Sequence, residues 1–218
     1  MFVSLRGKVC LVVGGGSVGE RKIRSLTQCG AVVRLVAQTL TPWLQAQCHN
    51  GSVTLVSNHY EEAQLQSADL VFAATDNPQL NRAITEQADS RRIWCNTATQ
   101  PELGSFIVPA IYRQGPLTIA VSTSGLSPAL AKTIRDQLEQ QFGAEWTPIL
   151  NLLGRVRTLV QSKGLPTSEN QRLFTVISRL PLQIWLKEQK QHLAFAAISE
   201  ICQPWLTRDE LKQVLGEQ

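Results

Sequence analysis

Several features are scarce in this chain of 218 residues, and each absence excludes a class of protein. Hydrophobic residues make up 43% of the chain, yet no apolar run approaches the roughly 18 residues that a membrane-spanning helix needs. The five cysteines are scattered and include no C-x-x-C pair, which excludes a disulfide framework and a structural zinc site. The 21 lysines and arginines exceed the 17 acidic residues only slightly and form no basic stripe, so the sequence disfavours nucleic-acid binding.

The start of the chain also lacks the layout of a secretory signal peptide. Met1–Lys8 leads directly into the first apolar segment. Scattered, unpatterned thiols are typical of a reducing compartment. We therefore expect a soluble, cytoplasmic protein that does not bind membranes.

The most informative feature that is present is a glycine-rich segment near the amino terminus. A Gly-x-Gly-x-x-Gly pattern follows the apolar run Val9–Val13 and precedes a helical pattern. Gly14 permits a tight turn, Gly16 lets a pyrophosphate approach the backbone, and Gly19 lets the helix pack close to the strand. The amides at the start of the helix attract a phosphate. The pattern indicates a dinucleotide site, and the alternative is a glycine-rich turn that binds no ligand.

Apolar runs and helical patterns alternate along the first half of the chain. The spacing predicts strands at 9–13, 31–36, 53–56, 70–74 and 92–96, and helices at 17–28, 41–48 and 77–88. This order predicts an α/β fold, a Rossmann-like doubly wound parallel sheet with its ligand at the carboxyl ends of the strands.

The second half has a different pattern. Phe106–Tyr112 and Leu117–Ser122 flank a Gly-Pro turn and predict an antiparallel β-hairpin. Ser127, followed by proline, has the signature of a helix start, and only helical patterns follow it. Capping boxes are expected to begin helices at Ser168 and Thr207.

The ends of the second and fourth strands bear on the choice of cofactor. Gln38 and Thr39 could bond a ribose, although the usual acid is absent, and no arginine is placed to meet a 2′-phosphate. This slightly favours NAD over NADP. Thr75 and Asp76 would also lie at the cofactor crevice. The alternative for this segment is that it simply caps the next helix.

Other catalytic patterns fail. The Tyr-x-x-x-Lys pattern of short-chain reductases is absent, because Gln64 and Pro116 stand at the lysine position after the two tyrosines. The three histidines lack metal-ligand spacing and are interpreted as surface residues.

Five distinctive blocks then occur in a fixed order along about residues 1–140. They are Gly14-Gly15-Gly16-x-Val18-x-x-Arg21-Lys22, Ala73-Ala74-Thr75-Asp76, Arg92-Ile93-x-Cys95-Asn96, Ser105-Phe106-Ile107-x-Pro109-Ala110 and Ala120-Val121-Ser122-x-x-Gly125-x-Ser127-Pro128-x-Leu130-Ala131. This set resembles the precorrin-2 dehydrogenase/sirohydrochlorin ferrochelatase family, the amino-terminal module of siroheme synthase. The Ser-Phe-Ile-x-Pro and Ser-Pro blocks are not general features of Rossmann proteins.

The resemblance implies NAD-dependent removal of two hydrogens from precorrin-2 to give sirohydrochlorin. In some members the same site then inserts ferrous iron, so iron is a possible second substrate. It also implies a homodimer. The expected division is an NAD-binding Rossmann domain at 1–105, a hairpin for dimerisation and the active cleft at 106–126, and a helical domain at 127–218.

Motif and resemblance together give the candidate site residues. The cofactor-binding candidates are Gly14, Gly16, Ser17, Val18, Gly19, Gln38, Thr39, Thr75 and Asp76. The substrate-binding candidates are Asn96, Ser122, Thr123, Ser124 and Ser127. A serine that some members phosphorylate falls at Thr123.

One position departs from the family pattern. An aspartate is expected three residues after Asn96, where this chain has Thr99. Threonine does not ionise near neutral pH, so Thr99 can form hydrogen bonds but cannot serve as a carboxylate base. Glu102 is the nearby carboxylate that could take this role, unless it is an exposed loop residue. The departure weakens the expectation of iron insertion more than that of dehydrogenation, in which the nicotinamide accepts the hydride.

Precorrin-2 is a polycarboxylate, so its site should offer cations. The basic residues in or beside the matched blocks are Arg21, Lys22, Arg113, Lys132 and Arg135. Two other functions stay open: a non-catalytic NAD- or tetrapyrrole-binding regulator on the same scaffold, and a dehydrogenase of an unrelated small substrate.

Overall fold

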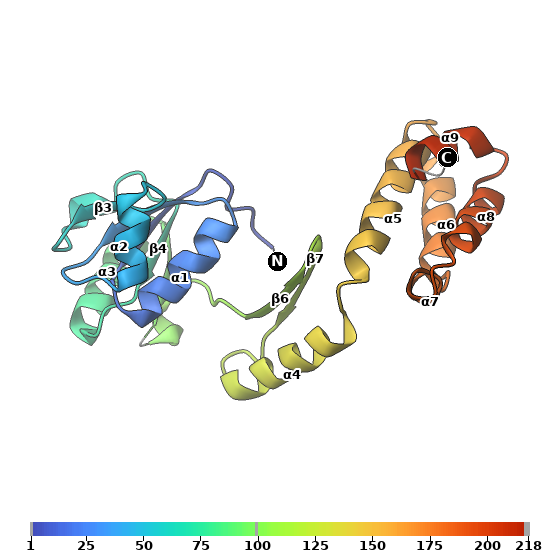
Figure 1. The fold of residues 1–218 in the computed structure, drawn as a ribbon. Helices are drawn as coiled ribbons and strands as arrows, with labels where there is room; N and C mark the ends of the chain where they lie inside the picture. The colour runs from blue at the N-terminus through green and yellow to red at the C-terminus, as the bar shows by residue number, and fades with distance from the viewer. Residues whose placement is uncertain (1, 99, 216–218) are drawn as a thin grey trace. The chain divides into compact units, whose positions relative to one another are not determined.

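The computed structural model describes residues 2–98 and 100–215. The chain divides into two compact units, Met1–Val108 and Pro109–Gln218, which follow one another along the colour gradient of Figure 1. The hairpin and the helices after it therefore belong to one unit. Among the described residues, no helix has both the length and the apolar character needed to cross a bilayer.

The first unit is built on a five-stranded sheet in which every pair of neighbouring strands is parallel. Its strands, in spatial order, are β3 (Thr54–Ser57), β2 (Val32–Val36), β1 (Val9–Val13), β4 (Leu70–Ala73) and β5 (Trp94–Thr97). The strand order reverses between β1 and β4, which is the switch point where such sheets bind ligands. The predicted Rossmann-like sheet is confirmed.

Helices cover both faces of this sheet (Figure 1). Ile23 and Leu44 pack on one face, and Leu65 and Ile84 pack on the other. Both faces of the central strands are therefore buried, which explains why these strands are continuously apolar in sequence. The helical elements of the unit are α1 (Ser17–Gln28), α2 (Pro42–His49), η1 (Glu62–Leu65), α3 (Pro78–Ser90) and η2 (Pro101–Leu103).

The second unit begins with an antiparallel hairpin of β6 (Ala110–Gln114) and β7 (Leu117–Val121), and a positive φ of 54° at Gly115 in its turn. The prediction that the first hairpin strand starts at Phe106 is wrong. The carbonyl oxygen of Phe106 accepts a hydrogen bond from Asn96 Nδ2 at 2.9 Å, so this part of the segment is bonded to β5.

Helices make up the rest of the second unit. Val156, Leu173 and Ile198 come from three of them and lie in one buried apolar cluster. The helices are α4 (Pro128–Gln141), α5 (Trp146–Gln161), α6 (Thr167–Ser178), α7 (Leu182–Lys187), α8 (Gln191–Cys202) and α9 (Arg208–Leu215).

The two predicted capping boxes have different outcomes. The box at Thr207 is confirmed, because Thr207 N donates to Glu210 Oε2 at 2.9 Å and Glu210 N donates to Thr207 Oγ1 at 3.2 Å. The box at Ser168 is wrong. α6 already begins at Thr167, directly after Pro166, so Ser168 lies inside its first turn.

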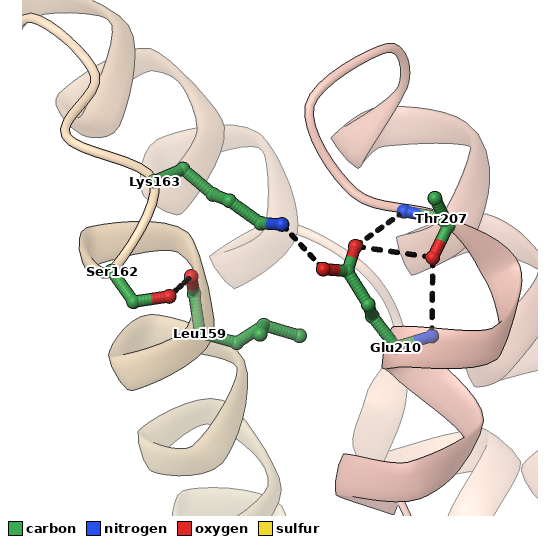
Figure 2. A network of polar contacts seen from close by, with 5 residues as sticks. All are labelled: Leu159, Ser162, Lys163, Thr207 and Glu210. Atoms are coloured by element: carbon green, nitrogen blue, oxygen red, sulfur yellow. Dashed lines mark hydrogen bonds and ion pairs between the residues drawn. The ribbon is translucent and has the colours of Figure 1, made fainter.

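Glu210 also connects two helices of this unit. Figure 2 shows its carboxylate between Thr207 and Lys163, with Oε1 accepting from Lys163 Nζ and Oε2 from Thr207. Lys163 follows the end of α5, so one carboxylate joins the end of α5 to the start of α9.

Candidate functional site

The loop between β1 and α1 has a tight, glycine-dependent geometry. Gly14 has a φ of 119°, and a Cβ atom there would lie 2.3 Å from the carbonyl oxygen of Ala74. A Cβ atom on Gly19 would lie 2.0 Å from the carbonyl oxygen of Gly14, so only glycine allows α1 to approach so closely. A Cβ atom on Gly16 would meet no atom of the described residues within 4 Å, apart from those of its chain neighbours. The loop is therefore closely packed except at Gly16, where a ligand phosphate has room to approach.

The start of α1 lies at this open position. Gly16 is the residue before the helix, and no side chain in the described part of the chain caps its amides. Ser17 is exposed and Val18 is half-buried. Uncapped amides at the positive end of a helix dipole favour binding of an anion. The geometry fits the diphosphate of a dinucleotide.

One acid, Glu20, lies in the first turn of α1. Hydrogen bonds from the Thr41 hydroxyl and from Arg24 lower the pKa of its carboxyl. Arg24 Nη2 lies 2.7 Å from Glu20 Oε1, and its guanidinium lies 3.9 Å from the ring centroid of Trp43. The negative charge of Glu20 is thus balanced by a stacked cation, which reduces its repulsion of a phosphate at the helix start.

The loop after β2 packs directly on the glycine loop. A Cβ atom on Gly15 would lie 2.2 Å from the carbonyl oxygen of Thr39, and Thr41 N donates to Gly15 O at 3.2 Å. Gln38 and Thr39 are exposed beside it, where a ribose could reach them. The role of Gly15 was missed from the sequence, although the run of three glycines was a signal for it.

The segment after β4 combines a buried anchor with a helix cap. The Thr75 hydroxyl donates to Asn81 Oδ1 at 2.7 Å, and Asn81 is fully buried. Asn77 Oδ1 accepts from Leu80 N at 3.1 Å, so Asn77 caps α3 as the capping alternative expected. Asp76 is exposed between them. The role of Asn81 was not predicted from the sequence, because this residue lies within the helical pattern of α3.

The Ser-Phe block at residues 105–106 is hydrogen-bonded to β5. Ser105 N donates to Cys95 O at 2.8 Å, and Cys95 N donates to Ser105 Oγ at 2.9 Å. Asn96 is buried, and its Nδ2 bonds the Phe106 backbone. That amide nitrogen therefore has a structural role, and substrate binding by Asn96 stays a prediction.

The two catalytic candidates follow β5. Thr99 lies outside the described residues. Glu102 lies on η2, and its side chain is exposed. Its proposed role stays a prediction, as does the alternative that it is an ordinary loop carboxylate.

The hydroxyl-rich loop of the second unit is held by its own side chains. Ser122 Oγ accepts from Ser124 N at 3.1 Å, and Thr123 Oγ1 accepts from Ser127 N at 3.0 Å. Ser127 Oγ accepts from Leu130 N at 3.3 Å, which confirms the predicted cap of α4. The loop is ordered by these bonds, and its contact with a substrate stays a prediction.

A parallel sheet whose first strand leads through a glycine loop into an uncapped helix defines a dinucleotide-binding protein of the Rossmann class. Residues 1–110 match a family model described as "Putative NAD(P)-binding", and residues 114–141 match one described as "Sirohaem biosynthesis protein central". The chain belongs to the family of the first model, so its first unit is an NAD(P)-binding domain, and its second unit carries a segment similar to the central part of sirohaem biosynthesis proteins.

Individual relatives agree with this assignment. Siroheme synthase of Salmonella schwarzengrund is 37% identical over 174 residues, which cover 80% of this chain and 38% of that protein. Siroheme synthase of Citrobacter koseri is 34% identical over 207 residues, which cover 95% of this chain and 45% of that protein. The chain thus spans less than half the length of these relatives.

A solved structure also resembles this chain. SirC, described as a precorrin-2 dehydrogenase, superposes with a TM-score of 0.74 at 25% identity. The match covers 92% of this chain and 98% of that one. The similarity therefore extends over both units.

Proposed function

We propose that this chain oxidises precorrin-2 to sirohydrochlorin with NAD. The observation that carries the proposal is the open position at Gly16 in front of the uncapped α1, because it leaves room for a diphosphate beside free amides. The near-complete overlap with SirC supports the choice of substrate.

The residues of the first unit have separate roles in this proposal. The amides of Ser17 and Val18 bind the diphosphate, and Gln38 and Thr39 bond the ribose hydroxyls. Thr75, which is hydrogen-bonded to Asn81, forms part of the carboxyl edge of the sheet beside the nicotinamide. When bound, NAD supplies the acceptor for a hydride.

The oxidation releases a proton as well as a hydride, so a base must accept that proton. Thr99 cannot, because a hydroxyl is not basic near neutral pH. We assign the role to Glu102 and expect Glu102→Gln to lower kcat by roughly 10²-fold with little change in the affinity for NAD. Glu86→Gln changes another exposed carboxylate and is the matched control. Unchanged turnover in Glu102→Gln would exclude this role.

The central experiment is anaerobic incubation with precorrin-2 and NAD. We expect the absorption spectrum of sirohydrochlorin and one NADH per product. Tetrapyrrole binding without turnover would instead indicate a regulator on this scaffold. Binding of NAD without binding of any tetrapyrrole would indicate a dehydrogenase of an unrelated substrate.

Iron insertion is tested by adding ferrous iron to the same reaction. Insertion displaces pyrrole protons, and the family aspartate is absent at Thr99. We therefore expect sirohydrochlorin to accumulate with no catalysed formation of siroheme. We expect Thr99→Asp to increase the rate of siroheme formation. Rapid siroheme formation by the wild type would show that another group accepts these protons.

We further propose that the chain forms a homodimer in the cytoplasm, where its five cysteines stay reduced. Exposed apolar side chains support self-association: Leu126 is 90% exposed and Leu130 is 51% exposed. Analytical ultracentrifugation should give twice the mass of the chain, and a monomer at micromolar concentration would contradict the proposal.

A further inference from the structure

Lys22 differs from the paired cations of the first unit. Its side chain is half-buried, and no carboxylate of the described residues forms an ion pair with it. Lys8, Arg24 and Arg91, by contrast, are exposed and have carboxylate partners at 2.9, 2.7 and 2.6 Å. Fully buried cations are almost always paired. Lys22 is partly withdrawn from water and has no carboxylate partner among the described residues, so a bound anion would stabilise its charge.

The surroundings of Lys22 are aromatic. Its Nζ lies 5.9 Å from the ring centroid of Phe72 on β4. Phe106 packs edge-on against that ring, with centroids 5.6 Å apart. Phe72 is the register partner of Asn96, which in turn bonds the backbone of Phe106. The ammonium thus lies over the edge of the core on the α1 face of the sheet, where Phe72 is buried at 3% exposure and the half-buried Phe106 is accessible to a ligand.

Burial destabilises the charged form of this group. Desolvation, with a smaller contribution from the charge of Arg21, lowers the pKa of Lys22. The ring of Phe72 compensates only partly for the lost water. A bound anion would restore the missing interaction, and the half-buried side chain is still open to a ligand.

We propose that Lys22 binds a carboxylate of the tetrapyrrole substrate while the half-buried ring of Phe106 contacts its apolar part. The inference rests on the proposed function, because precorrin-2 and sirohydrochlorin are polycarboxylates with an apolar ring system. Of the five basic candidates, Lys22 is chosen because it is half-buried, whereas Arg135 pairs with Asp136 and the others are exposed: Arg21, Arg113 and Lys132.

The cofactor diphosphate is the other anion to consider. It has its own donors at the start of α1, and Lys22 lies about 9 Å further along the helix than Gly16 at 1.5 Å per residue. The position above Phe72 therefore favours the substrate carboxylate.

The test compares Lys22→Met, which keeps the length of the side chain, with Arg21→Met, which removes the neighbouring exposed charge. Each variant is titrated anaerobically with sirohydrochlorin in the absence of NAD, and separately with NAD by calorimetry. We expect Lys22→Met to bind sirohydrochlorin about tenfold more weakly and with less salt dependence. We expect Arg21→Met to match the wild type and Lys22→Arg to recover part of the affinity.

Three results would overturn the inference. Equal affinity of wild type and Lys22→Met for sirohydrochlorin would show that Lys22 does not bind the substrate, and would leave the proposed function standing. A loss of NAD affinity in Lys22→Met would assign the ammonium to the diphosphate. A wild type that binds NAD but no sirohydrochlorin would overturn the proposed function together with this inference. Lys22→Gln, which also lacks the charge, should give the same result as Lys22→Met if the latter folds poorly.

Discussion

The side chain of Asn81 closes two hydrogen bonds onto the backbone of Thr75. Asn81 Nδ2 donates to the carbonyl oxygen of Thr75 at 3.0 Å, and Asn81 Oδ1 accepts from Thr75 N at 3.2 Å. Asn81 lies on α3 and is fully buried. A helix side chain thus fixes the backbone just beyond β4, at the carboxyl edge where the dinucleotide binds in this class of protein.

Replacing Asn81 should therefore affect stability and cofactor binding together. Asn81→Leu leaves the N–H and carbonyl of Thr75 without these partners, which costs about 1–3 kcal/mol of the free energy of unfolding. We expect a lower midpoint of urea denaturation and a weaker affinity for NAD. Asn77→Ala, which removes only the cap of α3, is the control and should lower stability by about 1 kcal/mol. Unchanged NAD affinity in Asn81→Leu would show that the position of Thr75 does not matter for binding.

Two glycines of the same loop should respond differently to alanine. At Gly16 the new methyl group would meet nothing within 4 Å in the described parts of the chain beyond its own neighbours, so Gly16→Ala should cost no more than about 1 kcal/mol of stability. The methyl group would occupy the space of the diphosphate, so NAD binding should fall by at least about tenfold. Thermal denaturation and calorimetry with NAD measure the two effects.

At Gly19 the methyl group would lie 2.0 Å from the carbonyl oxygen of Gly14. Gly19→Ala should therefore destabilise the protein without ligand, by several kcal/mol if α1 cannot shift. A Gly16→Ala protein that binds NAD as well as the wild type would contradict the assignment of the open position to the diphosphate.

Features specified by neighbouring residues could be predicted from the sequence. The glycine spacing indicated the turn, and the cap at Ser127 was predicted because its donor and acceptor are only three residues apart. The parallel sheet followed from the order of apolar runs, since such strands need helical crossovers.

Contacts between distant segments could not be predicted in this way. The hydrogen bond from Asn96 to Phe106 holds the start of segment 106–112 beside β5. The apolar pattern of these residues does not indicate this bond. The contact of Gly15 with Thr39 depends on how two loops meet after the sheet has formed. Ser168 has the residue pattern of a cap, but α6 already begins at Thr167, directly after Pro166.

The cysteines should differ in their reactivity toward a thiol reagent. Burial raises the pKa of Cys10 and of Cys202 to about 11, and it also raises the pKa of buried Cys95. Near pH 8 these three thiols are almost fully protonated and enclosed, so they should react only after unfolding. Cys29 and Cys48 are half-buried and should react first. Mass spectrometry of the partly labelled native protein locates the modified thiols, and early labelling of Cys10 would contradict the burial of β1.

Glu210 should make the helical unit sensitive to acid. Hydrogen bonds from Lys163 and from the backbone and hydroxyl of Thr207 lower its pKa to about 2 (Figure 2). The folded pKa lies below the ordinary value, so the stabilisation is fully present above about pH 4.3 and is lost as the pH falls toward 2. In Glu210→Gln the side chain is neutral and does not titrate between about pH 4.3 and pH 2. Its stability should therefore be lower than that of the wild type at neutral pH and should change less on acidification.

Hydrogen exchange of the α9 amides measures this effect locally, apart from the first unit. Protection of these amides in the wild type should decrease between about pH 4 and pH 2, after correction for intrinsic exchange rates. In Glu210→Gln it should start lower and stay nearly constant, while Glu200→Gln, a change at an exposed carboxylate of α8, should follow the wild type. Equal pH dependence in wild type and Glu210→Gln would mean that the link between α5 and α9 contributes little, and that acid acts on this unit through other carboxylates.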